Sequence, residues 1–342
     1  MSLDDPPASP RPTQLARLRA GLRALPFAWW WPLAVGVAIG LATRLAFDGS
    51  GTQALTVMTR SFVLLVPIVV GAATVFVAHR VARRSPWYDV LAGAGANVLL
   101  VLGTLAILVE GLICVIVIGP LFAVLGGVSG LATGVLCRMV KPPRGTLPAL
   151  AALPFLSAAL EQGAPPATHV ATIERVRVVA APPERVWREL VDTRAIEPEE
   201  IGHAWLYRIG VPLPTSGVVE PSLDGPVRRV AMGEGIRFDQ LAAVWEPNRH
   251  VRWAYRFAPD SFPPRALDDH VRIGGAFFDL GETDYVLTPL EGGRTELRVV
   301  FRHRVSTRFN WYAVPIADGL AGNFAEVVLG FYAARAERAA LP

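Results

Sequence analysis

The spacing of apolar positions divides this chain into two parts. Between residues 27 and 160 the apolar residues form long, nearly continuous runs, whereas from His169 onward they alternate with polar residues. Long apolar runs are typical of membrane-spanning helices, and alternation with a period of two is typical of strands. The pattern predicts a transmembrane domain over residues 26–162, a linker over 163–168 and a second, soluble domain over 169–338.

Four of the apolar runs approach or exceed the roughly 20 residues that cross the core of a bilayer. These predicted spans cover residues 27–47, 61–78, 87–109 and 112–136. A further run, residues 147–160, is shorter and contains Pro148 and Pro154. It is either a short fifth span or an interfacial helix, and this alternative decides on which side of the membrane the second domain lies. With five spans the domain is extracytoplasmic, and with four it is cytoplasmic.

Arginines and the single lysine predict the orientation of the spans. They cluster before the first run, directly after the second and directly after the fourth, where Arg138 and Lys141 lie. Because cytoplasmic loops carry the excess of basic residues, we expect these three clusters to be cytoplasmic. Residues 1–25, rich in Pro, Arg and Ala, are expected to form a disordered cytoplasmic leader. The sequence therefore predicts a multi-pass protein of the cytoplasmic membrane.

Small and charged residues within the apolar runs predict contacts between helices. Gly126, Gly130 and Gly134 recur every four positions, which places them on one helix face that should pack closely against a neighbour. Arg44 and Glu110 are both expected at the external interface, where an isolated charge is costly. We expect Glu110 to form a structural charge pair with Arg44, or alternatively with Arg60, rather than a proton or ion relay.

The second half begins with a strand over residues 169–179 and a helix that starts at Pro182-Pro183. Prolines in the first turn followed by an acidic residue favour a helix start. Residues 201–209 form a short helix or a loop, and the chain ends in a long amphipathic helix over 311–338. Between them, alternation and turn residues predict strands over 217–220, 226–232, 238–245, 251–257, 277–289 and 295–305.

This order predicts an α+β fold of the helix-grip type, in which a curved antiparallel sheet surrounds a long C-terminal helix. One helix covers such a sheet only in part, so a pocket should remain between them. Three segments carry a resemblance to a known superfamily, namely APPERVW at 181–187, WEPNR at 245–249 and LEGGRT at 290–295. Over residues 170–336 the chain resembles the SRPBCC superfamily, the START-like and polyketide cyclase/dehydrase-related domains.

The whole chain is similar to uncharacterised bacterial membrane proteins in which several spans precede such a domain. The resemblance implies a hydrophobic cavity for lipids, sterols, polyketides or similar ligands, with catalysis in only some members. It supplies no catalytic motif that could be carried over, so the function has to be argued from the pocket.

Aromatic residues on the predicted inner face are the candidates for contacting a ligand. On the last strand, Phe301 and His303 share the apolar face, and His303 is either a hydrogen-bonded structural residue or an acid–base group. Tyr255 could offer a hydroxyl to a ligand, although aromatic stripes at strand spacing also occur as plain core packing. The full set of expected ligand-binding residues is Trp253, Tyr255, Phe257, Phe301, His303 and Phe324.

Polar residues near the expected mouth of the cavity are the second group of candidates. Asp269 and His270 lie in the loop after a Pro-rich segment, where they either contact a ligand or are simply solvated. The histidines lack metal-ligand spacing, and no phosphate loop, nucleophile elbow or complete dinucleotide motif is present, so no metal and no cofactor is expected.

Charge and cysteine content narrow the function classes. The net charge is +4, but the basic residues lie beside apolar runs and include one lysine, which argues for membrane orientation and against a nucleic-acid partner. Cys114 and Cys137 lie too far apart along one run to form a disulfide within a helix. Nothing in the pattern predicts an oligomeric state.

Three functions remain open at this stage. The first is a non-enzymatic, membrane-anchored module that binds a lipid or another hydrophobic ligand from the bilayer. The second is a cyclase or aromatase that uses His303 with Tyr255, or the Asp269–His270 pair. The third is a structural or regulatory ectodomain that holds no ligand.

Overall fold

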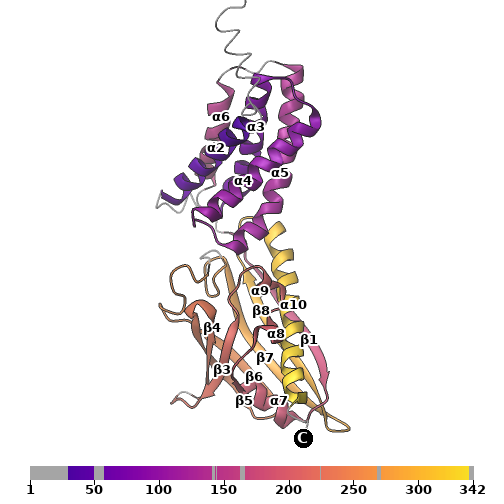
Figure 1. The fold of residues 1–342 in the computed structure, drawn as a ribbon. Coiled ribbons are helices and arrows are strands. Elements are labelled where there is room, and N and C mark those ends of the chain that lie inside the picture. The colour runs from indigo at the N-terminus through magenta and orange to yellow at the C-terminus, as the bar shows by residue number, and fades with distance from the viewer. Residues whose placement is uncertain are drawn as a thin grey trace, which may run out of the picture. The chain divides into compact units, whose positions relative to one another are not determined.

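The computed structural model of the chain describes residues 30–49, 58–140, 143, 145–161, 166–223, 225–267 and 271–338. It divides into two compact units (Figure 1). The helical unit comprises the chain up to Val57 with Ser61–Thr104 and Gly119–Glu161, and the sheet unit comprises Gln162–Pro342 with Met58–Arg60 and Leu105–Ile118. The predicted leader, residues 1–25, lies outside the described residues.

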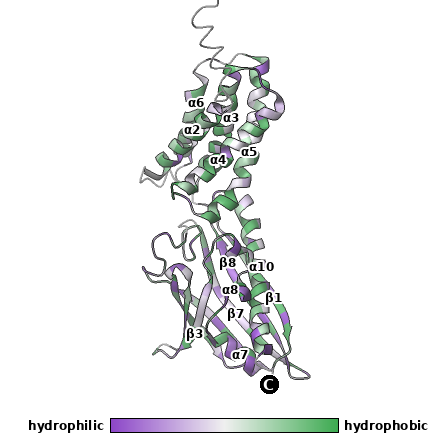
Figure 2. Cartoon of the chain, in the orientation of Figure 1, coloured by the Kyte–Doolittle hydropathy of each residue, from purple (hydrophilic) through white to green (hydrophobic). Residues whose placement is uncertain are grey.

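Apolar residues dominate the helices of the helical unit (Figure 2). These helices are α2 (Trp31–Gly49), α3 (Val66–Val81) with a π-helical turn before it (Ser61–Leu65), α4 (Pro86–Ala106), α5 (Leu112–Met139) and α6 (Thr146–Leu160). By length and composition, Ser61–Val81, α4 and α5 could each cross a membrane, as could α10 (Asn310–Arg338), whereas α2 and α6 are shorter apolar helices. Because α10 packs against strands of the sheet unit, it is the predicted amphipathic helix and not a further span.

Close helix contacts at glycines hold the helical unit together. A Cβ atom at Gly134 would lie 1.8 Å from Asp89 Oδ2, and one at Gly126 would lie 2.0 Å from Asn97 Nδ2. The glycine face of α5 therefore packs directly on α4, as its spacing predicts. Asp89 is fully buried and pairs with His79 Nε2 at 2.8 Å and with Arg138 Nη1 at 2.6 Å.

Hydrogen bonds also fix the direction of α6. Ser61 Oγ lies 3.0 Å from Ser157 Oγ, and Glu161 Oε2 accepts hydrogen bonds from Ser61 N at 3.0 Å and Ser61 Oγ at 2.8 Å. The C-terminal end of α6 thus lies beside the N-terminal end of α3. The His79–Asp89–Arg138 cluster lies at the opposite end of α3, so α6 follows the bundle away from that cluster.

The sheet unit contains one antiparallel sheet in the order β1-β8-β7-β6-β5-β4-β3-β2, which curves around α10 (Figure 1). Short helices α7 (Pro183–Val191), α8 (Pro198–Ile201) and α9 (Trp205–Arg208) follow the first strand. The strands are β1 (His169–Val179), β2 (Asp192–Thr193), β3 (Pro214–Glu220), β4 (Val227–Met232), β5 (Arg237–Glu246), β6 (His250–Arg256), β7 (Phe278–Leu290) and β8 (Arg294–Val305).

The core of the sheet unit lies between the sheet and α10. Its buried residues include Trp253, Leu297 and Val299 from the strands and Ala325 and Tyr332 from α10. The expected helix-grip arrangement of a curved antiparallel sheet around a C-terminal helix is therefore confirmed. The sheet face that meets α10 is called the inner face below, and the opposite face is called the outer face.

Candidate functional site

A row of polar residues crosses the inner face of three neighbouring strands. Arg228 on β4 lies directly opposite Gln240 on β5, and Gln240 lies directly opposite Tyr255 on β6. Residues directly opposite one another in an antiparallel sheet share a face. The alternation of each strand therefore places a cation, an amide and a phenol side by side under α10.

Arg228 lies at one end of this row and is 7% exposed. Its Nη1 donates to Gln240 Oε1 at 3.2 Å, and its Nη2 donates to Thr193 Oγ1 at 3.3 Å and to Tyr332 Oη at 2.9 Å. The buried Nε–H has no acceptor in the described part of the chain. All three acceptors are neutral, so no carboxylate among the described residues balances this charge.

Gly217 on β3 makes room for the guanidinium. A Cβ atom at this position would lie 2.5 Å from Arg228 Nη2 and 2.7 Å from its Nε. Real side chains do not approach that closely, so the guanidinium occupies the space that a side chain at residue 217 would fill. Burial opposes the charged form of Arg228, but the neighbouring Tyr332 and Tyr285 favour it, and the net effect is a raised pKa. The guanidinium is therefore charged at any physiological pH.

Tyrosines surround this end of the inner face. Burial raises the pKa of Tyr207, Tyr255 and Tyr285, so all three phenols remain protonated at neutral pH. Tyr255 Oη lies 2.8 Å from Thr283 Oγ1 on β7. The rings of Tyr285 and Tyr332 meet edge to face at 5.7 Å. The cluster can thus offer hydrogen bonds to a bound group but no negative charge.

The predicted ligand-binding residues differ in how accessible they are. Trp253 and Phe301 are buried, whereas Tyr255, Phe257 and Phe324 are half-buried. Trp253 packs edge to face against Trp245 at 6.0 Å, within the core. Sequence spacing alone could not separate these two groups, because all of these residues share the inner face.

Two half-buried aromatic residues that the sequence did not single out complete this part of the inner face. Tyr207 on α9 meets Phe324 edge to face at 6.1 Å, and Phe238 on β5 lies 6.0 Å from Tyr255 and 5.5 Å from Phe257. We call Tyr207, Phe238, Tyr255, Phe257 and Phe324 the half-buried aromatic group. Its members come from α9, β5, the β6 region and α10, so their convergence depends on the fold.

His303 lies on the inner face as expected and is fully buried. Its Nε2 lies 2.8 Å from Asp318 Oδ1 on α10, and its Nδ1 has no hydrogen-bond partner in the described part of the chain. Asp318 was not predicted, since nothing in its sequence context connects it to the last strand. A carboxylate that orients one ring nitrogen and leaves the other free is the arrangement of a general base. The absence of accessible surface on the ring opposes that role.

The remaining sequence candidates are not brought into this site. Asp269 and His270 lie outside the described residues. Arg44 is buried on α2 in the helical unit, whereas Glu110 is half-buried in the sheet unit, and their pairing stays a prediction. Across the described ranges, no group of three His, Cys, Asp or Glu residues is placed to hold a metal ion.

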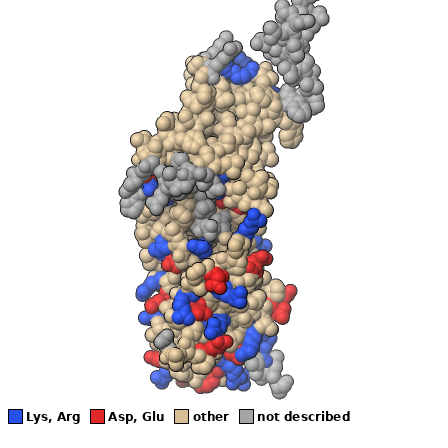
Figure 3. All heavy atoms as spheres, turned by 90° about the vertical axis from the view of Figure 1, so that its left-hand side faces the viewer, with Lys and Arg blue, Asp and Glu red and all other residues tan. Residues whose placement is uncertain are grey.

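An open hollow of about 700 Å³ lies at β3 to β6, lined by Arg229, Asp239 and Arg256 of the outer face and also by Phe238 and Phe257 of the half-buried aromatic group. Its charged lining is largely paired, with Arg229 to Glu220 at 2.6 Å and Arg256 to Asp239 at 2.7 Å. Figure 3 shows that charges of both signs are interspersed over the visible face of the sheet unit. Paired surface charges of this kind are typical of a solvated sheet face, so the inner face is the stronger candidate site.

Comparisons with known proteins identify solved structures only. No family model matches the chain, and no curated protein matches it. A START superfamily protein from Mycobacterium smegmatis is 16% identical, with 49% of this chain and 98% of that chain covered at a TM-score of 0.34. The Zhui aromatase/cyclase from a Streptomyces species is also 16% identical, with 50% of this chain and 95% of that chain covered at a TM-score of 0.30.

A protein from Mesorhizobium loti is 19% identical, with 50% of this chain and 100% of that chain covered at a TM-score of 0.30. A START protein and an aromatase/cyclase are thus among the similar structures, the two groups to which the sequence resemblance points. At such TM-scores the likeness carries no argument about function, which has to come from the site.

Proposed function

We propose that this chain is a membrane-anchored binding protein whose sheet unit holds a hydrophobic or amphipathic ligand between the sheet and α10. The half-buried aromatic group is the observation that carries this proposal. Tyr207 and Tyr255 are surrounded deeply enough for burial to raise the pKa of each phenol, yet both keep accessible surface. A side chain of this kind packs against the core and still offers part of its surface to a ligand.

The chemistry of the inner face supports the same function. Ligand sites are mostly apolar and aromatic, with a few polar groups that orient the ligand. Here Phe238, Phe257 and Phe324 supply apolar surface, and the Arg228–Gln240–Tyr255 row supplies the polar groups.

The helical unit supports two parts of the proposal, namely that the chain is anchored in a membrane and that the sheet unit is extracytoplasmic. Three of its helices are long and apolar enough to cross a membrane. Arg138 and His79 mark the end of the bundle that also carries Arg80, Arg83 and Arg84, and basic residues favour the cytoplasmic side. Since α6 ends beside Ser61 at the other end, the chain leaves the bundle there. We therefore propose five crossings, with α6 as a short fifth, and an extracytoplasmic sheet unit.

An enzyme is the second candidate, and the His303–Asp318 contact favours it. The 2.8 Å hydrogen bond orients the imidazole and leaves Nδ1 as a free acceptor when the proton is on Nε2. A substrate could reach that nitrogen only after a rearrangement, because the ring has no exposed surface. Binding without turnover therefore accounts for more of the observations.

The test is whether the full chain retains a ligand at the inner face. We would purify the wild-type chain in a mild detergent and look for a bound lipid of defined mass by native mass spectrometry. Ala321→Trp inserts a large ring beside Phe324 on the half-buried side of α10 and should abolish retention. Ala334→Trp is the matched control, because Ala334 is exposed on the same helix. An empty wild-type protein would favour the ectodomain without a ligand, and equal occupancy in Ala321→Trp would refute binding at the inner face.

A further inference from the structure

Arg228 is a buried cation to which the described part of the protein supplies no counter-charge. Its hydrogen-bond partners are Gln240, Thr193 and Tyr332, all neutral, and its Nε–H has no partner. Burying an ion is costly unless an opposite charge and hydrogen bonds offset the lost hydration. If Arg228 only connected β2, β5 and α10 by hydrogen bonds, a neutral polar side chain could do so with a smaller desolvation free energy.

The surroundings of Arg228 hold the guanidinium in one orientation. Hydrogen bonds from β2, β5 and α10 converge on it, and Gly217 leaves the space in which it lies. Pre-organised donors of this kind are found where a protein recognises a planar anion, because the orientation cost is met before binding. One strand, β5, lies between those that carry Arg228 and Tyr255, so the two backbone positions are about 10 Å apart along one face.

We propose that Arg228 binds the carboxylate of an amphipathic acid whose apolar body lies against the half-buried aromatic group. This inference rests on the proposed function, since it names the chemical class of the ligand held at the inner face. One guanidinium, with no second described cation hydrogen-bonded to the cluster, matches a head group with a single negative charge. The Tyr332 hydroxyl, 2.9 Å from Arg228 Nη2, can donate a further hydrogen bond to the carboxylate.

The experiment compares two probes that share a hydrocarbon chain and differ in charge, oleate and oleyl alcohol. Both are offered at equal concentration to the full chain in a neutral detergent, and occupancy is measured by native mass spectrometry. The wild type should prefer oleate by about tenfold or more, the size expected for hydrogen bonds to a charged group. Arg228→Gln should lose this preference and still bind oleyl alcohol.

Arg229→Gln is the control, because Arg229 is the next residue on β4, faces the outer side and pairs with Glu220. It should keep the wild-type preference. Gly217→Ala provides a second variant that retains the charge and displaces the guanidinium, and it too should lose the preference. Thermal unfolding identifies a folded variant: without added ligand, Arg228→Gln should unfold at the same temperature as the wild type or higher.

The outcomes separate this inference from the proposed function. If the wild type binds both probes equally, or if Arg228→Gln keeps the preference for oleate, the carboxylate site is wrong and hydrophobic binding survives. If the wild type binds neither probe and carries no lipid, both proposals fail together. Loss of the preference in Arg229→Gln would show that surface charge, and not the buried cation, selects the acid.

Discussion

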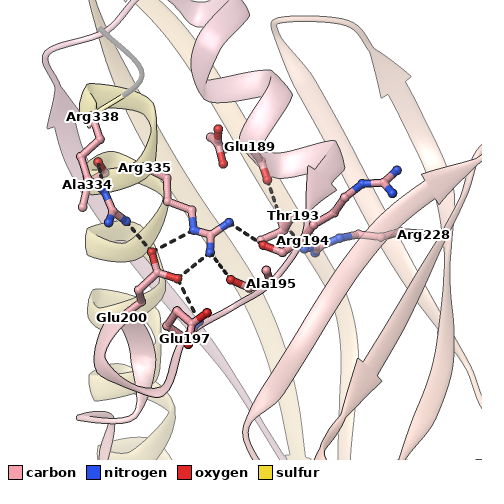
Figure 4. Close-up of polar contacts among 10 residues, drawn as sticks. All are labelled: Glu189, Thr193, Arg194, Ala195, Glu197, Glu200, Arg228, Ala334, Arg335 and Arg338. Carbon is pink, nitrogen blue, oxygen red and sulfur yellow. Dashed lines mark hydrogen bonds and ion pairs between the residues drawn. The ribbon is translucent and has the colours of Figure 1, made fainter. Parts of the chain in front are cut away.

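The Glu200 carboxylate on α8 accepts two hydrogen bonds from the guanidinium of Arg335, near the end of α10 (Figure 4). Arg335 Nε lies 3.1 Å from Oε1, and Arg335 Nη2 lies 2.5 Å from Oε2. Arg338 donates to the same carboxylate, and Arg335 also donates to the carbonyl oxygens of Arg194 and Ala195 at 2.9 Å each. This cluster fastens the C-terminal end of α10 to the segment that precedes β3.

The Glu200–Arg335 pair predicts a loss of stability in acid. The hydrogen bond from Arg335 lowers the pKa of Glu200 from 4.5 to about 2, against the opposing effect of burial. Because the folded pKa is depressed, the stabilisation is complete above the unfolded value and is lost as the pH falls from 4.5 towards about 2. Because solvent screens a pair near the surface, the contribution is smaller than the full shift implies, about 1 to 2 kcal/mol at neutral pH.

Chemical denaturation of the wild type and Glu200→Gln, followed by tryptophan fluorescence, tests this prediction. The difference in free energy of unfolding between them should be large at neutral pH and should vanish near the folded pKa. Glu199→Gln serves as the control, since Glu199 is exposed in the same helix. A difference that does not change with pH would mean that the pair does not contribute in this way.

Gly134→Ala should destabilise the helical unit by about 1 to 3 kcal/mol, the range for overpacking in a close contact. The added Cβ atom would lie 1.8 Å from Asp89 Oδ2, so either the Asp89 side chain or the contact between α4 and α5 would have to shift. Gly119→Ala on the same helix should be nearly neutral, because its Cβ atom would lie 4.0 Å from Val101 Cγ1. Thermal unfolding in detergent compares the two, and equal melting temperatures would contradict the close packing.

The five-crossing topology predicts that the sheet unit is exported. An alkaline phosphatase fused after residue 342 should be active in intact bacterial cells, and a fluorescent protein that folds only in the cytoplasm should be dark at the same position. Fusions after residue 85, at the basic end of the bundle, should behave in the opposite way. The reverse result for the C-terminal fusions would make α6 an interfacial helix.

Replacement of His303 separates binding from turnover. His303→Gln should leave ligand retention close to the wild-type level, because the ring is fully buried and its only described hydrogen-bond partner is Asp318. Native mass spectrometry measures the retention. If the ligand stays bound and is recovered unmodified from wild type and variant alike, a catalytic role for this histidine is excluded; a product present only with the wild type would favour the enzyme.

Much of the fold could be predicted because its signals are local. The strand from 169 to 179 coincides with β1, and the last strand and helix agree with β8 and α10 within one residue. The two-residue strand β2 is too short to show a period. The choice between a fifth span and an interfacial helix for residues 147–160 stays a prediction, and it involves contacts such as that between Ser61 and Ser157, which are 96 residues apart.

The candidate site was harder to predict, for a specific reason. Arg228 and Arg229 are adjacent, so the strand shows two identical charges where alternation would separate an inner residue from an outer one. Only the partners distinguish them, Gly217 and Tyr332 for the first and Glu220 for the second. The contact between Asp318 and His303 could not be predicted either, because the chain turns back between β8 and α10 and brings the two residues together only in the folded structure.

The two adjacent arginines also bear on how β4 reaches its correct alignment. A slip by one position would put Arg229 where Arg228 lies in the native sheet, so the charge at that position would be unchanged, although the other side chains of β4 would change face. The two arginines are distinguished by their surroundings. In the native pairing Arg228 occupies the space beside Gly217, and Arg229 pairs with the carboxylate of Glu220. Gly217→Ala would fill the space beside Arg228 and so weaken the preference for the native pairing of β3 with β4. We therefore expect this variant to refold slowly or heterogeneously.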